Sequence, residues 1–221
     1  RRVRWVFSTV LFFLLALTLF RFLFYAGYRH QAAVSPAPAF WMGLRFDLKF
    51  VSMAGLFMLV LSLLPALDPF QSRRSRSFWI FSLTLMWTGL LVFYSVDYFH
   101  YDYLHQRLNA SVLNYLQDTS ISLGMVVQSY PVIPMGLVLL LAMAAGWYVI
   151  RKILFRIDAQ IDQPVKRPAL FFVSQFLLFA ALIFGKAGQY NLRWSDAFTL
   201  GDPFNGQLAL NPLQSFFSTL K

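Results

Sequence analysis

The sequence has no cysteine and no glutamate, so all nine of its acidic residues are aspartates. Without cysteine, this chain can contain no disulfide, no catalytic thiol and no thiolate metal site. It also lacks a Gly-x-Ser-x-Gly nucleophile sequence, a Walker loop and the HExxH zinc spacing. We therefore expect no catalytic residues, no metal site and no cofactor in this chain, and we expect that it makes and breaks no bonds by itself.

Charged side chains are also scarce, at 13% of the residues, whereas 58% are hydrophobic and 19% are aromatic. Soluble domains have about 25% charged and about 45–50% apolar residues. The composition is therefore typical of an integral membrane protein, and we expect a single membrane domain.

Five apolar segments approach or reach the roughly 20 residues that a helix needs to cross a bilayer. The expected spans are residues 5–28, 45–67, 78–97, 132–153 and 169–187, and the proline-containing residues 34–39 are expected to form a loop. A signal peptide also begins with basic residues, but its apolar region has only about 7–15 residues, and the first segment is longer. The sequence thus predicts an all-α integral membrane protein with a five-transmembrane-helix bundle over residues 1–190.

Two side chains well within the expected spans are strongly polar, Arg21 and Gln175. Arg21 follows Arg4 by about 25 Å along a helix, so we expect its side chain to reach the far membrane interface. A proton or ion pathway normally needs ionisable groups that face the interior of the bundle. Their scarcity here argues against a pump or a secondary transporter.

Cationic residues are distributed unequally between the two sides of the expected bundle. Seven lie on the side of the carboxyl terminus, together with six of the nine aspartates. Eleven lie on the other side: Arg1, Arg2, Arg4, Arg73, Arg74, Arg76, Arg151, Lys152, Arg156, Lys166 and Arg167. The positive-inside rule then places the amino terminus in the cytoplasm and the carboxyl terminus outside. The net charge of +10 is thus a topology signal, and we expect no nucleic-acid partner.

The longest connection, residues 97–130, is expected to lie outside the membrane. Apolar residues recur within it on one face of a helix, at Leu108, Val112, Tyr115 and Leu116. Ser120 or Ser122 could cap a second short helix. We interpret this connection as one or two interfacial helices on the outer leaflet, between the third and fourth spans.

Several polar residues are candidates for a lipid-headgroup site. Arg45 and Lys49 are one helical turn apart at the expected outer mouth of the second span, so both could face a lipid phosphate. Alternatively, Arg45 could pair with Asp97 and fasten the second span to the third. Asp47 is a further candidate for structural pairing.

The same two alternatives, headgroup binding and structural pairing, apply to Arg107 with Asn109 and to Arg193 with Asp196.

The histidines and aspartates near the end of the third span could in principle hold a metal. Asp97 and His100 would share a helical face, but His100 and His105 would not. Interfacial hydrogen bonding is therefore the interpretation we favour for Asp97, His100, Asp102 and His105.

The last segment, residues 186–221, is too polar for hydrocarbon and too short to bury a core of its own. Three parts of the sequence carry a resemblance to a known family. The first part lies in the last segment and consists of Leu192 to Phe198, Asn205, and Leu208 to Pro212. The other two parts are the run from Gly43 to Asp47 and the run from Asp97 to Asn109. They resemble the lipoteichoic acid synthase family, which includes phosphoglycerol and phosphoethanolamine transferases of bacterial envelopes. The first of the three looks like the family's junction between membrane and catalytic parts, and it is the specific one.

This resemblance implies that five membrane helices precede an extracytoplasmic, sulfatase-like domain of the alkaline-phosphatase superfamily. That domain would supply a threonine nucleophile and a divalent metal (manganese, magnesium or zinc), and residues 191–221 would be the linker toward it. The chain would then anchor the enzyme in the bacterial cytoplasmic (inner) membrane and position an anionic phospholipid donor. A non-enzymatic lipid- or envelope-sensing protein with an inactive outer domain is the alternative, and a small transporter is the third possibility.

Overall fold

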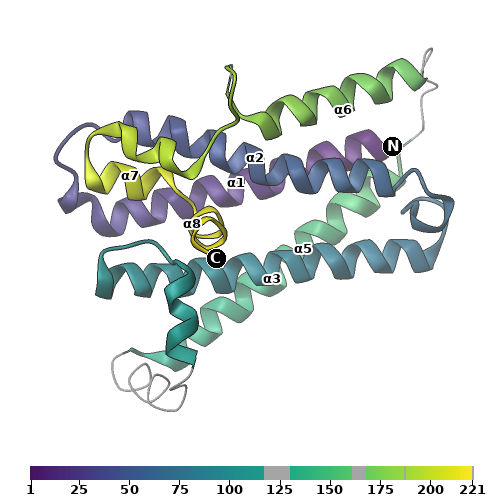
Figure 1. Cartoon of the computed structure of the whole chain (residues 1–221). Coiled ribbons are helices and arrows are strands. Elements are labelled where there is room, and N and C mark those ends of the chain that lie inside the picture. The colour runs from purple at the N-terminus through teal and green to yellow at the C-terminus, as the bar shows by residue number, and fades with distance from the viewer. Residues whose placement is uncertain (117–129, 161–167, 187, 221) are drawn as a thin grey trace.

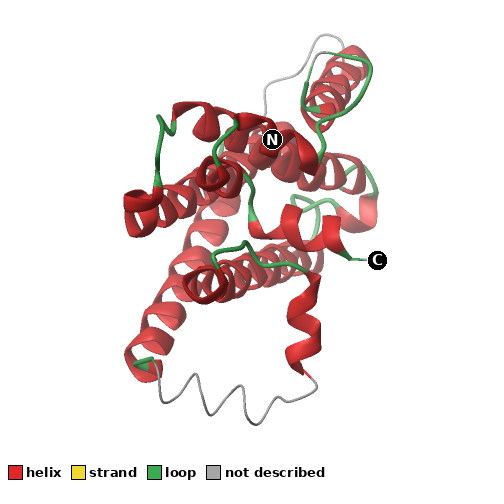
Figure 2. Cartoon of the chain, turned by 60° about the vertical axis from the view of Figure 1, so that its left-hand side comes forward, coloured by secondary structure: helices red, strands yellow, loops and turns green. Residues whose placement is uncertain are grey.

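The computed structural model describes residues 1–116, 130–160, 168–186 and 188–220. These residues form helices and no strands (Figure 2). The α-helices are α1 (Arg2–Tyr28), α2 (Ala37–Leu61), α3 (Arg73–Leu104), α5 (Val132–Asp158), α6 (Pro168–Phe184), α7 (Pro203–Ala209) and α8 (Pro212–Thr219). Short 3-10 helices connect them, namely η1 (Arg29–Gln31), η2 (Pro65–Leu67), η3 (Ala110–Leu116) and η4 (Trp194–Leu200). The prediction of an all-helical chain is confirmed for the part of the chain described.

Three helical stretches are long and apolar enough to cross a membrane, namely Arg2–Gln31, Arg73–Leu104 and Val132–Asp158. Residues 169–184 form a shorter apolar helix. Large side chains on the outward faces of the helices are exposed, among them Phe57, Phe81 and Leu141. Soluble monomers rarely leave apolar surface of that extent uncovered, so the fold is compatible with a membrane protein.

Both expected boundaries of the helix in the second span are wrong. α2 begins at Ala37, well before residue 45, since Pro38 lies in its first turn, where proline's missing N–H and fixed φ are tolerated. Residues 37–39 are thus helix and not loop, and Arg45, Asp47 and Lys49 lie mid-helix. At its other end α2 stops at Leu61, short of the expected 67.

Two further helices, α3 and α6, end at other residues than expected. α3 continues beyond residue 97 to Leu104, where His105 ends it in the left-handed conformation at φ 53°. α6 ends at Phe184 and not at 187, because Gly185 adopts φ 76°, the conformation typical of a glycine at a helix end.

The expected helix through residues 108–116 forms only in part. η3 begins at Ala110, and Leu108 lies before it, with its backbone N–H donating to Asp97 Oδ1 at 2.7 Å. That hydrogen bond holds Leu108 against α3, before the first residue of η3. The suggested caps at Ser120 and Ser122 lie outside the described residues.

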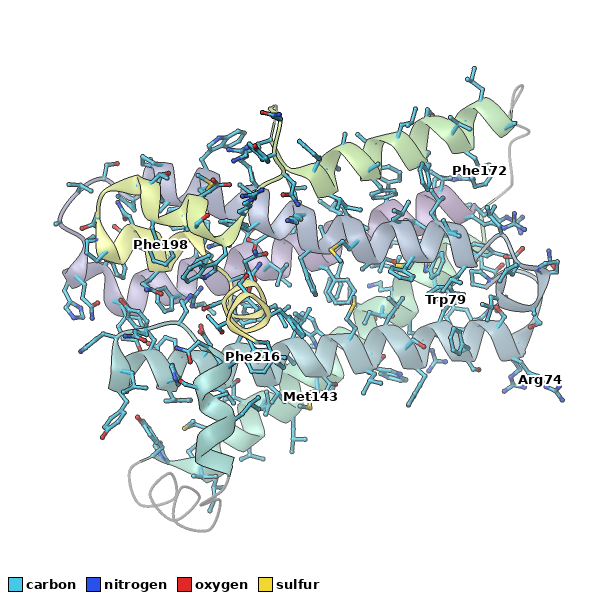
Figure 3. The ribbon with its side chains drawn as sticks, in the orientation of Figure 1. Arg74, Trp79, Met143, Phe172, Phe198 and Phe216 are labelled. Carbon is cyan, nitrogen blue, oxygen red and sulfur yellow. The ribbon has the colours of Figure 1, made fainter. Side chains whose placement is uncertain are left out.

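α1 and α2 lie side by side, and α2 also packs against α6 and α7 (Figure 1). α3 crosses α5 and contacts α8, where the Phe216 ring is 5.5 Å from that of Phe93 (Figure 3). One apolar core fills the bundle around Trp5, Phe13 and Trp87. A second core, around Phe24 and Leu208, joins the bundle to the segment after α6.

Gly146 allows α3 and α5 to approach closely, and its replacement by valine is expected to destabilise the protein. A Cβ at this position would overlap the Trp87 indole, whose Nε1 donates to Ala142 O at 2.9 Å. Small residues permit such contacts between membrane helices, and overpacking typically costs about 1–3 kcal/mol. Thermal unfolding in detergent should show this loss for Gly146→Val. The same change at Gly136, where a Cβ has open space, is the control, and an equal loss at both positions would contradict the packing role.

Candidate functional site

Arg21 of α1 is buried at the end of the bundle that holds α7. Arg21 is 2% exposed, and Asp47 of α2, which is 0% exposed, pairs with it at 2.8 Å. Arg21 also donates to the backbone carbonyl oxygens of Gly43 (3.1 Å), Ala209 (2.8 Å) and Leu208. The expectation that Arg21 reaches out to the membrane interface is therefore wrong, since its charge is neutralised inside the protein.

A second buried ion pair lies beside the first. Arg107, 2% exposed, pairs with Asp97 of α3, which is 1% exposed, and its other terminal nitrogen donates to Leu210 O at 2.7 Å. Arg107 also lies over the Phe24 ring, 4.0 Å from its centroid. The alternative that Arg45 pairs with Asp97 is wrong, because Arg107 occupies that carboxylate.

The two arginines converge on the same short stretch of backbone. Arg21 approaches Leu210 O at 3.3 Å, so both guanidinium groups donate to one carbonyl at the end of α7. Carbonyls at a helix carboxyl end are left without intrahelical donors, and cations are favourable there. We call Arg21, Asp47, Asp97, Arg107 and the Leu208–Leu210 carbonyls the arginine clamp.

Two asparagines complete the attachment of the carboxyl-terminal segment. Asn211 donates to Asp47 Oδ1 at 3.2 Å, and its own side-chain oxygen caps α8 by accepting the N–H of Gln214 at 2.7 Å. Asn205 donates to Ser35 O at 3.0 Å. Both asparagines are buried, so residues 192–215 fold onto the bundle and do not extend from it as a free connector.

Arg45 and Lys49 of α2 contact the chain that follows α6. Arg45 Nε donates to Gly185 O at 2.9 Å, and Lys49 Nζ donates to Leu192 O at 2.7 Å. Both side chains are half-buried and hold the chain where it leaves α6. Their role toward a lipid headgroup stays a prediction.

Asp196 pairs with Lys186 at 2.9 Å. Burial of this carboxyl would raise its pKa, but hydrogen bonds from the Arg193 backbone N–H and from Lys186 outweigh that effect and hold the pKa below its usual value. The Arg193 side chain is exposed and stacks over Tyr190 at 4.7 Å. Asn109 accepts the N–H of Ser111 at 2.9 Å, which is a local turn contact. Neither Arg193 nor Asn109 therefore lies in the arginine clamp.

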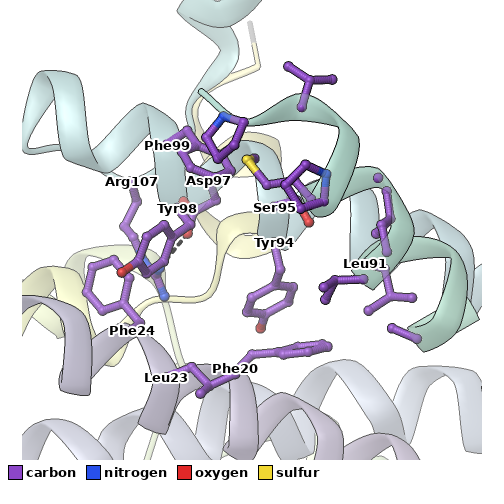
Figure 4. Close-up of a pocket in the computed structure, with 18 residues that line it drawn as sticks. Phe20, Leu23, Phe24, Leu91, Tyr94, Ser95, Asp97, Tyr98, Phe99 and Arg107 are labelled. Atoms are coloured by element: carbon purple, nitrogen blue, oxygen red, sulfur yellow. Dashed lines mark hydrogen bonds and ion pairs between the residues drawn. The ribbon is translucent and has the colours of Figure 1, made fainter. Parts of the chain in front are cut away.

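An apolar cavity of about 740 Å³ adjoins the arginine clamp, between α1, α3 and the start of α5 (Figure 4). Phe20, Leu91 and Leu139 lie on its walls, and Asp97 and Arg107 lie at its edge. Two buried polar atoms next to it, Arg107 Nε and Tyr94 Oη, have no hydrogen-bond partner within the described chain. The volume lies in the range of pockets that hold small amphiphiles.

The histidine candidates do not lie together as a set of metal ligands. His100 Nδ1 is 2.9 Å from Gln106 O, and His105 ends α3. Among residues 1–116, 130–160, 168–186 and 188–220, no three histidine or aspartate side chains come together as metal ligands.

Sequence reasoning missed the clamp because it treated the segment after α6 as a connector. The signals were present: Asp202-Pro203 and Asn211-Pro212 each combine a good N-cap with a proline at the first helical position. A lone arginine in an apolar segment also calls for a buried partner, and Asp47 is that partner.

No family model, curated protein or solved structure matches this chain.

Proposed function

We propose that this chain is the membrane anchor of a bacterial envelope phosphoglycerol or phosphoethanolamine transferase, similar to lipoteichoic acid synthase. The arginine clamp carries the proposal. Two buried ion pairs fix residues 208–211 onto the bundle, so a sulfatase-like domain that follows Lys221 would start from a fixed point. Holding an enzyme near its lipid donor raises the effective concentration of that donor, and the gain is largest when the geometry is restricted.

Five membrane spans are part of this proposal, with α2 and α6 added to the three longest apolar helices. α2 carries three charges, but Asp47 is neutralised by Arg21, and Arg45 and Lys49 donate to backbone carbonyls. Charged groups inside a membrane typically face the bundle and are paired in this way. α6 has 17 residues, and a short span is accommodated by local thinning of the bilayer at modest cost.

The cavity beside the clamp supports a role in positioning the lipid donor. Its apolar walls suit acyl chains, and Arg107, which also lines it, supplies a cation for the phosphate. The proposed orientation places this end at the outer surface of the cytoplasmic membrane, where η3 would lie on the leaflet.

The deciding experiment compares the isolated chain with the product of the gene read about 150–300 residues further. The longer protein is expected to contain a threonine nucleophile with aspartate and histidine ligands for a divalent metal, and to transfer a headgroup from phospholipid in proteoliposomes. The isolated chain is expected to transfer none. A longer protein without those residues would favour the sensing alternative, and solute flux through the isolated chain would favour a transporter.

Topology is testable because the chain has no cysteine of its own. Cysteine is introduced singly at Arg74, whose side chain points away from the bundle (Figure 3), at Tyr103, which is 83% exposed, and at Ser218, which is also exposed. An impermeant thiol reagent added to intact cells is expected to label positions 103 and 218 but not 74. Labelling of position 74 alone would reverse the orientation and remove the basis for an external enzyme.

A further inference from the structure

A second cavity, of about 690 Å³, lies at the opposite end of the bundle from the arginine clamp, between the start of α3 and the last turns of α5. Its walls combine three arginines with aromatic side chains: Arg73, Arg76, Arg151, Phe81, Trp147 and Phe155. Neither the clamp nor the proposed transferase role uses these residues.

The cavity has an excess of positive charge. One carboxylate, Asp158, pairs with Arg76 at 2.7 Å. Arg151 instead lies against the rings of Trp147 (5.3 Å) and Phe155 (5.4 Å). Within the described chain neither Arg73 nor Arg151 has an acidic partner, so three guanidinium groups face one carboxylate.

The amino end of α3 adds to the positive electrostatic potential of the cavity. Ser72 caps the helix by accepting the N–H of Ser75 at 3.0 Å, and Ser72, Arg73 and Ser77 all line the cavity. The amino end of a long helix carries a partial positive charge that favours anions. Arginine is well suited to phosphate because its planar group can donate two parallel hydrogen bonds.

The other side of the cavity is apolar and reaches the exposed surface of the bundle. Ile80 and Phe81 line it, and Phe81 is 68% exposed. Arg151 and Lys152 directly follow the uncharged stretch of α5, as expected for a cavity at the boundary between hydrocarbon and water. An occupant with an anionic phosphate at one end and hydrocarbon at the other fits both sides.

We infer that this cavity binds an anionic glycerophospholipid, with its phosphate against Arg73, Arg76 and Arg151 and its chains along Ile80 and Phe81. Basic pockets between membrane helices bind anionic headgroups in this way. The site is independent of the proposed function, since it depends neither on a further domain nor on the orientation of the chain.

The test measures the apparent Kd of the detergent-solubilised chain for phosphatidylglycerol, with phosphatidylcholine as the neutral comparison. Arg73→Ala with Arg151→Ala is expected to weaken phosphatidylglycerol binding by about fivefold for each arginine removed, with little change for phosphatidylcholine. These two side chains are exposed and have no acidic partner, so the double variant is expected to keep the thermal stability of the original chain.

The matched control removes the same charge from outside the cavity, by Arg74→Ala with Arg156→Ala. It is expected to leave the Kd nearly unchanged, and an equal weakening in both double variants would overturn the site in favour of diffuse surface charge. Arg73→Lys with Arg151→Lys keeps the charge and is expected to weaken binding by less than the alanine pair. An unchanged Kd in the alanine pair would overturn the inference.

Free anions distinguish a lipid site from a phosphate site. Inorganic phosphate and glycerol 3-phosphate at millimolar concentration are expected not to displace phosphatidylglycerol, because they lack the chains that contact Ile80 and Phe81. Complete displacement by either anion would reassign the cavity to a soluble phosphate compound and overturn the lipid assignment.

Discussion

Replacing Arg21 with alanine is expected to lower the free energy of unfolding by about 3–5 kcal/mol. The substitution leaves the Asp47 carboxylate fully buried with Asn211 as its remaining side-chain donor, and it strips donors from three carbonyls of the 208–210 stretch. A buried charge without its partner is among the costliest defects in a protein interior. Denaturant or thermal unfolding in a fixed detergent measures the loss.

A matched control uses the ion pair between Lys186 and Asp196, whose side chains are 30% and 23% exposed. Lys186→Ala is expected to cost no more than about 1 kcal/mol, as for other partly exposed pairs. The combined Arg21→Met and Asp47→Leu variant is expected to recover part of the loss, because it removes both charges. If Arg21→Ala and Lys186→Ala cost the same, Arg21 does not hold the bundle together.

Helix geometry that was visible in the sequence separates Asp47, the partner of Arg21, from the two cations of α2. Arg45 and Lys49 are four residues apart and share a face of α2, whereas Asp47 is two residues from each and points to nearly the opposite side. Asp47 therefore faces α1, while the two cations face the chain that leaves α6. The sequence alone does not show which helix lies on which side of α2, so the pairing itself required the structure.

The helical conformation of the apolar segments was predicted correctly, because a long uncharged stretch has few alternatives to a helix. Their ends were predicted less well, because Pro38 was interpreted as a breaker and α3 continues through the aromatic residues after Asp97. The fold of residues 192–215 depends on contacts with α1, α2 and Arg107, which lie far away in the sequence. Local patterns reveal the caps at Asp202 and Asn211 but not the surface against which the capped helices pack.

Replacing Arg107 with alanine is expected to release the carboxyl-terminal segment while most of the bundle stays folded. Arg107 joins Asp97, Leu210 O and the Phe24 ring in one contact, and breaking a buried pair of this kind costs about 3–5 kcal/mol. Because α7 and α8 are short, that cost is expected to appear as local opening. Amide hydrogen exchange in α7 and α8 should accelerate by about 150-fold or more, at 1.4 kcal/mol per factor of ten, with little change in α2 or in the crossing of α3 with α5.

Two further substitutions show whether the geometry of Arg107, and not its charge alone, holds the segment. Arg107→Lys keeps a positive charge near Asp97, but an ammonium group cannot donate in the planar, two-ended manner that reaches Asp97 and Leu210 O together, so intermediate exchange is expected. Arg193→Ala removes an exposed cation of the same segment and is expected to leave exchange unchanged. Protection of α7 and α8 that survives Arg107→Ala would mean that the apolar contacts of Phe204 and Leu208 hold the segment, and the clamp could not then be what fixes the position of a following domain.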